Sequence, residues 1–122
     1  MEELWKLSAA EIAIGIQRGT FSASEVADSV LGRVDEKNPE LNAITVEFPE
    51  QVHAAAAQAD EALRNGEPLG PLHGVPVTIK ENIDVAGQAT PNGVPAFADL
   101  IAKEDAPLVK NLRDAGAIVV GR

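Results

Sequence analysis

The stretch Val75-Pro76-Val77-Thr78-Ile79-Lys80 decides the fold of this chain. Its apolar residues alternate along the chain and predict a buried strand, which is entered through a rigid loop rich in proline and glycine. A second continuous apolar run, residues 117–120, predicts another buried strand. A helix is predicted between the two, and the order strand, helix, strand predicts parallel pairing. We therefore expect an α/β fold in which short parallel strands are covered by about four helices.

Each expected helix carries its own start and stop signals. Ser8-Ala-Ala-Glu11 and Ser22-Ala-Ser-Glu25 are capping boxes, in which serine and glutamate satisfy backbone N–H groups at a helix start. We expect the second helix to end at Asn38-Pro39, because proline disfavours helical geometry in the preceding residue. The expected helices cover residues 9–18, 23–38, 49–64 and 106–114, the last of them capped by Asp105 and followed by Ala115-Gly116.

Residues 81–104 follow neither a helical nor a strand period. Loops longer than about 12–15 residues are usually functional or disordered. Val94, Phe97, Leu100 and Ile101 make this loop apolar enough to pack against the rest of the chain, so we expect it to be ordered. A shorter β-prone run is predicted at residues 44–46.

Composition excludes several classes of function. The 122 residues include 10 Lys and Arg against 19 Asp and Glu, a net charge of −9, which argues against nucleic-acid and membrane partners. The chain has no cysteine, which excludes disulfides, zinc–thiolate sites and thiol nucleophiles and favours the cytoplasm. We expect one domain or part of one, mostly helical over residues 1–66, with the strands, loop and fourth helix in residues 67–122.

Lys80 is the residue that stands out chemically. It emerges at the carboxyl end of the expected strand, where ligands gather in open α/β sheets. A neutral amine at such a position can act as a base or a nucleophile. The alternative is a solvated lysine paired with Glu81 or Asp84, and the pattern alone favours that alternative.

The two histidines, His53 and His73, give weaker signals. His53 falls in an expected helix, where a solvated or packed role is typical. His73 lies in a rigid loop, where a ring nitrogen can tie down backbone groups. The acidic residues are spread over helix faces, so we expect no metal site.

Two blocks of sequence resemble the amidase signature family. Residues 70–85, Gly-Pro-Leu-His-Gly-Val-Pro-Val-Thr-Ile-Lys-Glu-Asn-Ile-Asp-Val, resemble its lysine-bearing motif, and residues 105–121 resemble the block that follows. The two helices before them resemble the family's N-terminal pair, so the resemblance covers nearly the whole chain. It implies the N-terminal part of the family's mixed-sheet α/β fold.

The resemblance also implies an activity. Members of the family are serine hydrolases of amides that use a Ser–cis-Ser–Lys triad and no cofactor, and Lys80 matches the lysine. In that mechanism the lysine takes a proton through the cis-serine, so that the other serine can attack the carbonyl. The matched motifs further imply substrate contacts at Asn82, Thr90 and Gly93, and a site shaped by His73, Gly74 and the 84–101 loop.

The sequence departs from the family at several positions. All serines of the chain lie at or before residue 29, and none matches a family serine. Val94 stands where many members have serine, and Glu81 replaces a frequent aspartate. We therefore expect the chain to be the first quarter of an amidase, as an artificially shortened chain, the product of a split gene, or a proteolytic product.

Three other functions stay open from the sequence. The first is the amidase-type subunit of a glutamine-dependent amidotransferase, which uses the same triad. The second is a non-catalytic assembly domain with a structural Lys80, and the third a Schiff-base enzyme, for which no supporting residue is evident. The leading interpretation has a small-molecule amide as substrate and the remainder of an amidase, or a second copy of the chain, as partner.

Overall fold

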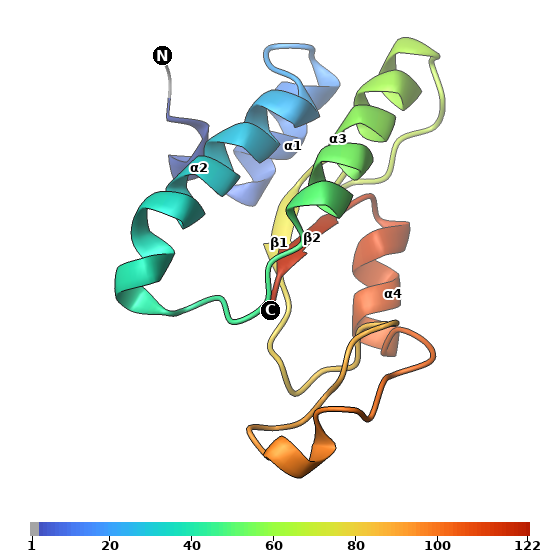
Figure 1. Ribbon diagram of the computed structural model, residues 1–122. Coiled ribbons are helices and arrows are strands. Elements are labelled where there is room, and N and C mark those ends of the chain that lie inside the picture. Colours follow the sequence, from blue (N-terminus) through green and yellow to red (C-terminus); the bar gives the residue numbers. More distant parts are fainter. Residues whose placement is uncertain (1–2) are drawn as a thin grey trace.

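The computed structural model describes residues 3–122 (Figure 1). It confirms an α/β architecture with four α-helices and a two-stranded parallel sheet. None of the helices in this described part is long and apolar enough to cross a membrane. The elements in chain order are η1 (Leu4–Lys6), α1 (Ala9–Gln17), α2 (Ala23–Leu41), α3 (Pro49–Arg64), β1 (Pro76–Thr78), η2 (Pro95–Phe97), α4 (Pro107–Asp114) and β2 (Ile118–Gly121).

The sheet is built around β2. β1 pairs with it in parallel, as predicted, and the register slips by one residue because Val77 faces Val119 whereas Thr78 faces Gly121. On the other side of β2, Glu47 forms a single antiparallel bridge with Gly121. The β-prone run at residues 44–46 is not a strand, and the isolated bridge lies directly after it, at Glu47.

One apolar core joins the helices to the strands. α2 packs on α3, α2 contacts η1 and β1, and α3 contacts β2. In Figure 1 the strands are seen between the α2–α3 pair and α4. The core is aliphatic apart from Phe48, and its fully buried side chains include Ile16, Val26, Val52 and Val109.

The start signals of α1 and α2 are confirmed, but the predicted end of α2 is wrong. Both capping boxes are formed. α2 continues through Pro39 to Leu41, because proline in the last turn removes only one helical donor. The Asn38 side chain also bonds both the N–H and the C=O of Ile44, and Asn42 closes the helix in a left-handed conformation.

Asp105 does not cap α4, contrary to the sequence prediction. The N-cap is Ala106, with no capping side chain. The Asp105 carboxylate instead accepts from the Ala86 N–H at 2.8 Å and pairs with Arg113 Nε at 3.1 Å. α4 tolerates the missing cap because Pro107 in its first turn has no N–H to satisfy.

The 81–104 loop is ordered by its backbone contacts and, near its start, by the buried side chain of Val85. It contains η2 and a bridge between Ala89 and Ile101. The expectation that its apolar side chains pack on the chain is wrong, since Phe97 is 45% exposed and Leu100 is 62% exposed, with Val94 and Ile101 also exposed. In Figure 1 the part of the loop that contains η2 extends away from α2 and α3.

Candidate active site

Lys80 lies two residues beyond the end of β1 and is exposed, while its neighbour Ile79 is buried. The backbone around it is fixed, because the Ile79 N–H donates to the Gly121 carbonyl at 3.1 Å and the Ile83 N–H donates to the Lys80 carbonyl at 3.0 Å. Within residues 3–122 its amine forms neither a hydrogen bond nor an ion pair. The amine is therefore accessible to a reacting group at the carboxyl end of the strand.

The residues suggested as ion-pair partners of Lys80 are not paired with it. The Glu81 carboxylate accepts from the Thr45 hydroxyl at 3.0 Å. Asp84 is exposed, and its carbonyl accepts from the Ala106 N–H. The solvated-lysine alternative is thus correct about exposure and wrong about the partner.

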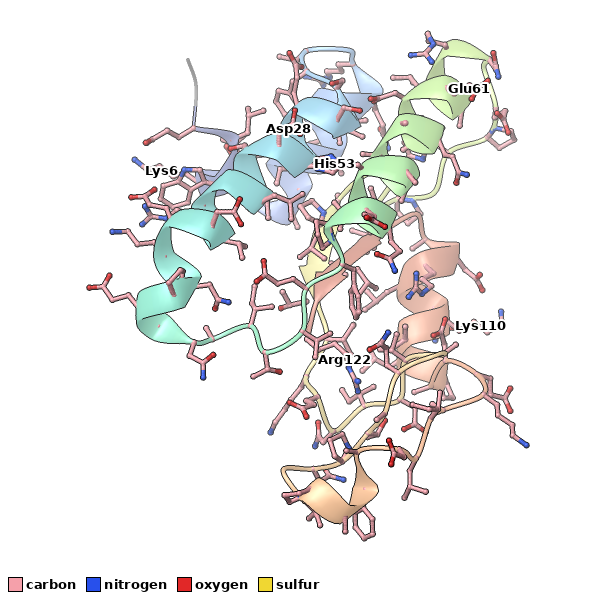
Figure 2. The ribbon with its side chains drawn as sticks, viewed as in Figure 1. Lys6, Asp28, His53, Glu61, Lys110 and Arg122 are labelled. Carbon is pink, nitrogen blue, oxygen red and sulfur yellow. The ribbon has the colours of Figure 1, made fainter. Side chains whose placement is uncertain are left out.

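Arg122 is a residue that sequence reasoning missed. It is only 5% exposed, and its guanidinium donates to the carbonyls of Glu81, Ile83 and Ala89. Figure 2 shows it at the end of β2, beside the loop that follows β1. A charged residue directly after an apolar strand was the available signal, and it gave no indication of which backbone groups the side chain would bind.

The other sequence-predicted site residues lie along the same loop. Asn82 is exposed in the turn after Lys80. Thr90 is half-buried, and among the described residues its hydroxyl is a buried oxygen without a partner. Gly93 is exposed at a positive φ of 76°, and no contact within residues 3–122 brings it toward Lys80. The Arg122 side chain therefore bonds the backbone on both sides of Asn82 and directly before Thr90.

His73 and Gly74 position the motif instead of contacting Lys80. The His73 ring is buried, and its Nε2–H donates to the Ala59 carbonyl in α3 at 2.8 Å, which confirms the backbone-tying role. Gly74 has a φ of 80°, and a Cβ there would lie 2.8 Å from Ile16 Cδ1. These contacts fix where β1 begins relative to α1 and α3.

His53 and the acidic residues form no metal centre. His53 is exposed on α3, 3.6 Å from the Asp28 carboxylate. Throughout residues 3–122 no group of three or more His, Cys, Asp or Glu side chains could hold a metal ion.

All four serines of the chain have structural roles. Ser8 and Ser22 cap α1 and α2. The Ser24 hydroxyl donates to Asp60 at 2.6 Å, and the Ser29 hydroxyl accepts from the Trp5 N–H at 3.0 Å. None is available beside Lys80 as a nucleophile.

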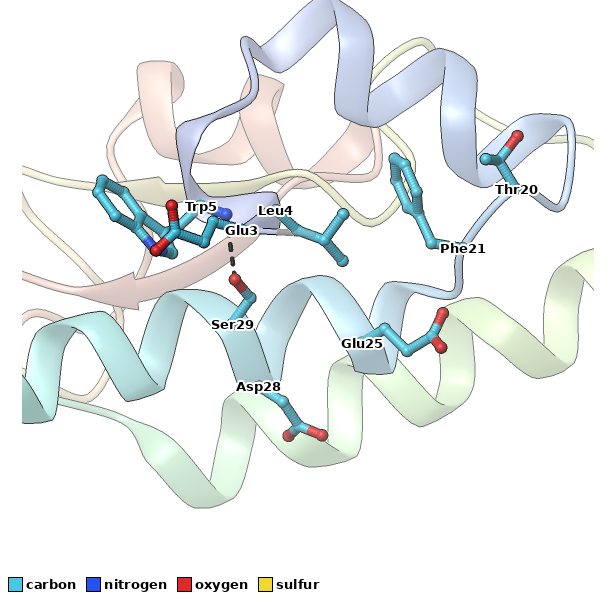
Figure 3. A pocket seen from close by; sticks show the side chains of 8 residues that line it. All are labelled: Glu3, Leu4, Trp5, Thr20, Phe21, Glu25, Asp28 and Ser29. Atoms are coloured by element: carbon cyan, nitrogen blue, oxygen red, sulfur yellow. Dashed lines mark hydrogen bonds between the residues drawn. The ribbon is translucent and has the colours of Figure 1, made fainter. Parts of the chain in front are cut away.

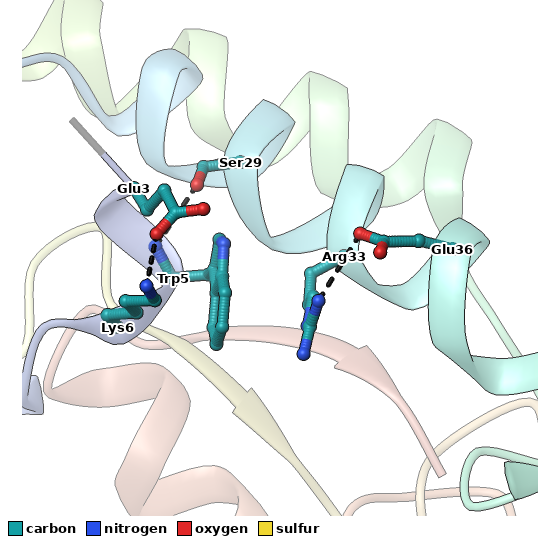
Figure 4. A network of polar contacts seen from close by, with 6 residues as sticks. All are labelled: Glu3, Trp5, Lys6, Ser29, Arg33 and Glu36. Carbon is teal, nitrogen blue, oxygen red and sulfur yellow. Dashed lines mark hydrogen bonds and ion pairs between the residues drawn. The ribbon is translucent and has the colours of Figure 1, made fainter. Parts of the chain in front are cut away.

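A hollow of about 520 Å³ lies between η1 and α2, away from Lys80 (Figure 3). Its lining is part apolar and part acidic: Glu3, Leu4, Trp5, Thr20, Phe21, Glu25, Asp28 and Ser29. The polar contacts next to it attach the N-terminal segment to α2 (Figure 4). Arg33 lies 4.1 Å from the centre of the Trp5 ring, and the hydrogen bond from Lys6 lowers the pKa of Glu3. These contacts anchor the N-terminal segment to α2.

Comparison with known proteins relates the chain to a family of enzymes. The family model described as Amidase matches residues 25–122. An indoleacetamide hydrolase of Bradyrhizobium diazoefficiens is 48% identical over 97% of this chain and 22% of its own length. A glutamyl-tRNA(Gln) amidotransferase subunit from Alkalilimnicola ehrlichii is 40% identical over 93% of this chain and 23% of its own length.

The fold gives the same relationship. The structure of native peptide amidase from Stenotrophomonas maltophilia superposes with a TM-score of 0.83 and 33% identity, covering 96% of this chain and 24% of that one. The chain thus spans about a quarter of the length of the relatives it matches.

Proposed function

Because the chain belongs to the amidase family, we propose that it is the lysine-bearing part of an enzyme that hydrolyses a carboxamide to a carboxylate and ammonia. The observation that carries this proposal is the exposed Lys80 amine at the carboxyl end of β1, inside the sequence block that resembles the family's lysine motif. Its backbone is held on both sides by hydrogen bonds, which fixes the point from which the Lys80 side chain extends.

In the proposed mechanism, neutral Lys80 takes the proton of a bridging serine as that serine takes the proton of the nucleophilic serine. The nucleophile attacks the amide carbon, and the C–N bond breaks as a proton returns through the same chain to the leaving nitrogen, which departs as ammonia. Water then attacks the acyl-enzyme by the same proton path and releases the carboxylate. Hydrogen-bond donors aimed at the developing oxyanion complete the machinery.

We propose that both serines come from a Gly/Ser-rich segment of the kind that the family carries. The support is that the four serines of this chain are engaged in capping and anchoring. Asn82, Thr90 and Gly93 are proposed to contact the substrate.

A second candidate is the amidase subunit of a glutamine-dependent amidotransferase. The observation that favours it is the 40% identity to a subunit of that kind. It uses the same role for Lys80 but delivers the ammonia to another active site.

We also propose a cytoplasmic location, supported by the absence of cysteine. Residues 1–122 are proposed to form part of a single domain, since one core contains side chains from both halves. The exposed apolar side chains of the 81–104 loop are proposed to contact further polypeptide, either the remainder of an amidase or a second copy.

The test is ammonia release by the complete gene product that contains residues 1–122, with indoleacetamide, a primary aryl carboxamide and glutamine as substrates. Lys80→Ala should lower kcat by at least about 100-fold, the usual contribution of a general base. Lys103→Ala, which removes an exposed lysine of the neighbouring loop, is the matched control. Full activity of Lys80→Ala would refute the proposed role, and ammonia release from glutamine alone would favour the second candidate.

A further inference from the structure

Arg122 is a buried cation that has no acidic partner in the described residues. Its side chain is 5% exposed, and its hydrogen bonds within residues 3–122 all go to backbone carbonyls. Burying a charge costs free energy unless hydrogen bonds replace the lost water. Three carbonyl oxygens supply that replacement here, so the side chain is committed to one geometry.

The three carbonyls belong to two places along the loop. Nη2 donates to Glu81 at 2.8 Å and to Ile83 at 2.9 Å, the turn that begins immediately after Lys80. Nη1 donates to Ala89 at 2.5 Å, the residue before Thr90. One rigid, planar guanidinium therefore ties the turn after Lys80 to the segment that carries Thr90.

The backbone of β2 forms a further hydrogen bond on the other side of Lys80. Gly121 accepts from the Ile79 N–H, and the Arg122 carbonyl accepts from the Thr45 N–H at 2.7 Å. Lys80 thus lies between a strand bond to Gly121 and a side-chain bond from Arg122. These two hydrogen bonds are made by adjacent residues at the end of one strand.

Two buried side-chain atoms without a partner mark the same place. Among the described residues these are Arg122 Nε and the Thr90 hydroxyl. Unpaired buried polar atoms are rare in folded proteins and call for a specific explanation. Both atoms lie where Arg122 ties the turn after Lys80 to the Thr90 segment, so each is free to bond a polar group of a bound molecule.

We propose that Arg122 is a positioning residue that sets the location of Lys80 relative to Thr90 and so aligns the base with the bound amide. This inference rests on the proposed function of Lys80. Without the guanidinium, residues 81–90 lose a shared anchor, and the amine is spread over a wider range of positions. Misplacement of a reacting group lowers the rate of the chemical step more than it weakens substrate binding.

The structural arm of the test measures amide hydrogen exchange in Arg122→Lys of the complete gene product that contains residues 1–122. Lysine keeps the charge but cannot bond three separated carbonyls. We expect exchange at the Ile83 and Ala86 amides to accelerate at least about tenfold while the buried amides of α3 stay protected. Arg64→Lys, the same change at an exposed position, is the matched control and should leave both regions unchanged.

The kinetic arm uses the complete gene product that contains these residues. Arg122→Lys should lower kcat about 10- to 100-fold and change KM less than about threefold. In Arg122→Gly, added methylguanidine should restore part of kcat, since it can occupy the vacated place as a donor. Restoration by a small guanidinium is a result that a general loss of stability would not give.

Each outcome decides the matter. Unchanged exchange at Ile83 together with unchanged kcat would overturn the positioning role and leave the Lys80 assignment intact. An equal loss of protection in α3 and in the loop, without rescue by methylguanidine, would overturn it in favour of a general stabilising role. An active Lys80→Ala variant would refute the proposed function, and the exchange measurement would still decide whether Arg122 holds the loop.

Discussion

The α2–α3 pair and the 81–104 loop are stabilised in opposite ways. In the helix pair, apolar side chains are buried and polar groups bond within one turn or to the facing helix, as Ser22 does with Glu25 and Ser24 with Asp60. In the loop, Val85 is buried but the apolar side chains of residues 94–101 are exposed, and the backbone is held by side chains from outside it, Asp105 and Arg122. The comparison teaches that the helix pair combines local capping with apolar packing and the distant Ser24–Asp60 contact, whereas the loop backbone depends on side chains 19 to 41 positions away.

The largest expected difference between the regions is in their tolerance of charge. Val52 of α3 is fully buried, so Val52→Asp should cost more than about 4 kcal/mol and unfold the chain. Phe97→Asp in the loop should change stability by less than about 0.5 kcal/mol, because that ring is already half in solvent. Urea denaturation followed by circular dichroism measures both, and equal losses would remove the distinction.

A smaller difference in stability is expected when each of two glycines with positive φ is replaced by alanine. A Cβ at Gly116, which follows α4 with a φ of 99°, would lie 2.7 Å from the His73 backbone. Gly116→Ala should therefore cost about 2–4 kcal/mol, the sum of left-handed strain and a close contact. Gly87→Ala in the loop has open space around it and should cost about 1–2 kcal/mol from strain alone. Thermal denaturation of the two variants should rank them in this order.

Asp60 tests the bond between the two helices. Its carboxylate accepts from the Ala23 and Ser24 N–H groups and from the Ser24 hydroxyl, so that α3 caps the start of α2. Asp60→Ala should cost about 1.5–3 kcal/mol, as expected for hydrogen bonds to a charged group. Asp60→Asn, which keeps one acceptor oxygen, should lose less. Exchange of the 81–104 amides should be unchanged in both, and a large increase there would show that the loop depends on the helix pair.

The smallest expected effect is the pH dependence of a capping box. The hydrogen bond from the Ser8 N–H lowers the pKa of Glu11 below its ordinary value of 4.5. The charged form therefore adds stability that is present above that value and is lost as pH falls through the lowered pKa. Glu11→Gln keeps an acceptor without titrating, so its stability should fall less between pH 7 and pH 3. Glu61→Gln serves as the control, and identical pH profiles for wild type and Glu11→Gln would contradict the prediction.

The helix pair was predictable because its signals are local. Both capping boxes and the stop of α3 at Asn65-Gly66 depend on residues within one helical turn, and each lies where the sequence predicts. Lys80 was also predictable as the residue that emerges from β1. These features need only the spacing of neighbouring residues along the chain.

The remaining features depend on partners beyond the neighbouring helical turn, most of them far away in sequence. The sequence predicts Asp105 as a cap because it precedes a helix, yet its carboxylate accepts from the Ala86 N–H, nineteen positions earlier. The end of α2 was missed because Asn38 binds the chain beyond the proline. Arg122 reaches back 41 positions to Glu81, and spacing rules contain no information about such a contact.

The one-residue slip between β1 and β2 limits which changes in chain length the molecule can accept. Thr78 pairs with Gly121 and not with Val120, so Arg122 sits one step nearer to the start of β1 than an even ladder would place it. Deleting one of the two valines at 119–120 would shift Arg122 along the ladder, even though the strand would remain apolar. Exchanging one valine for isoleucine changes only side-chain volume and leaves the position of Arg122 along the ladder unchanged. The length of β2 therefore sets the position of Arg122, and natural variation in this strand should favour substitutions over insertions and deletions.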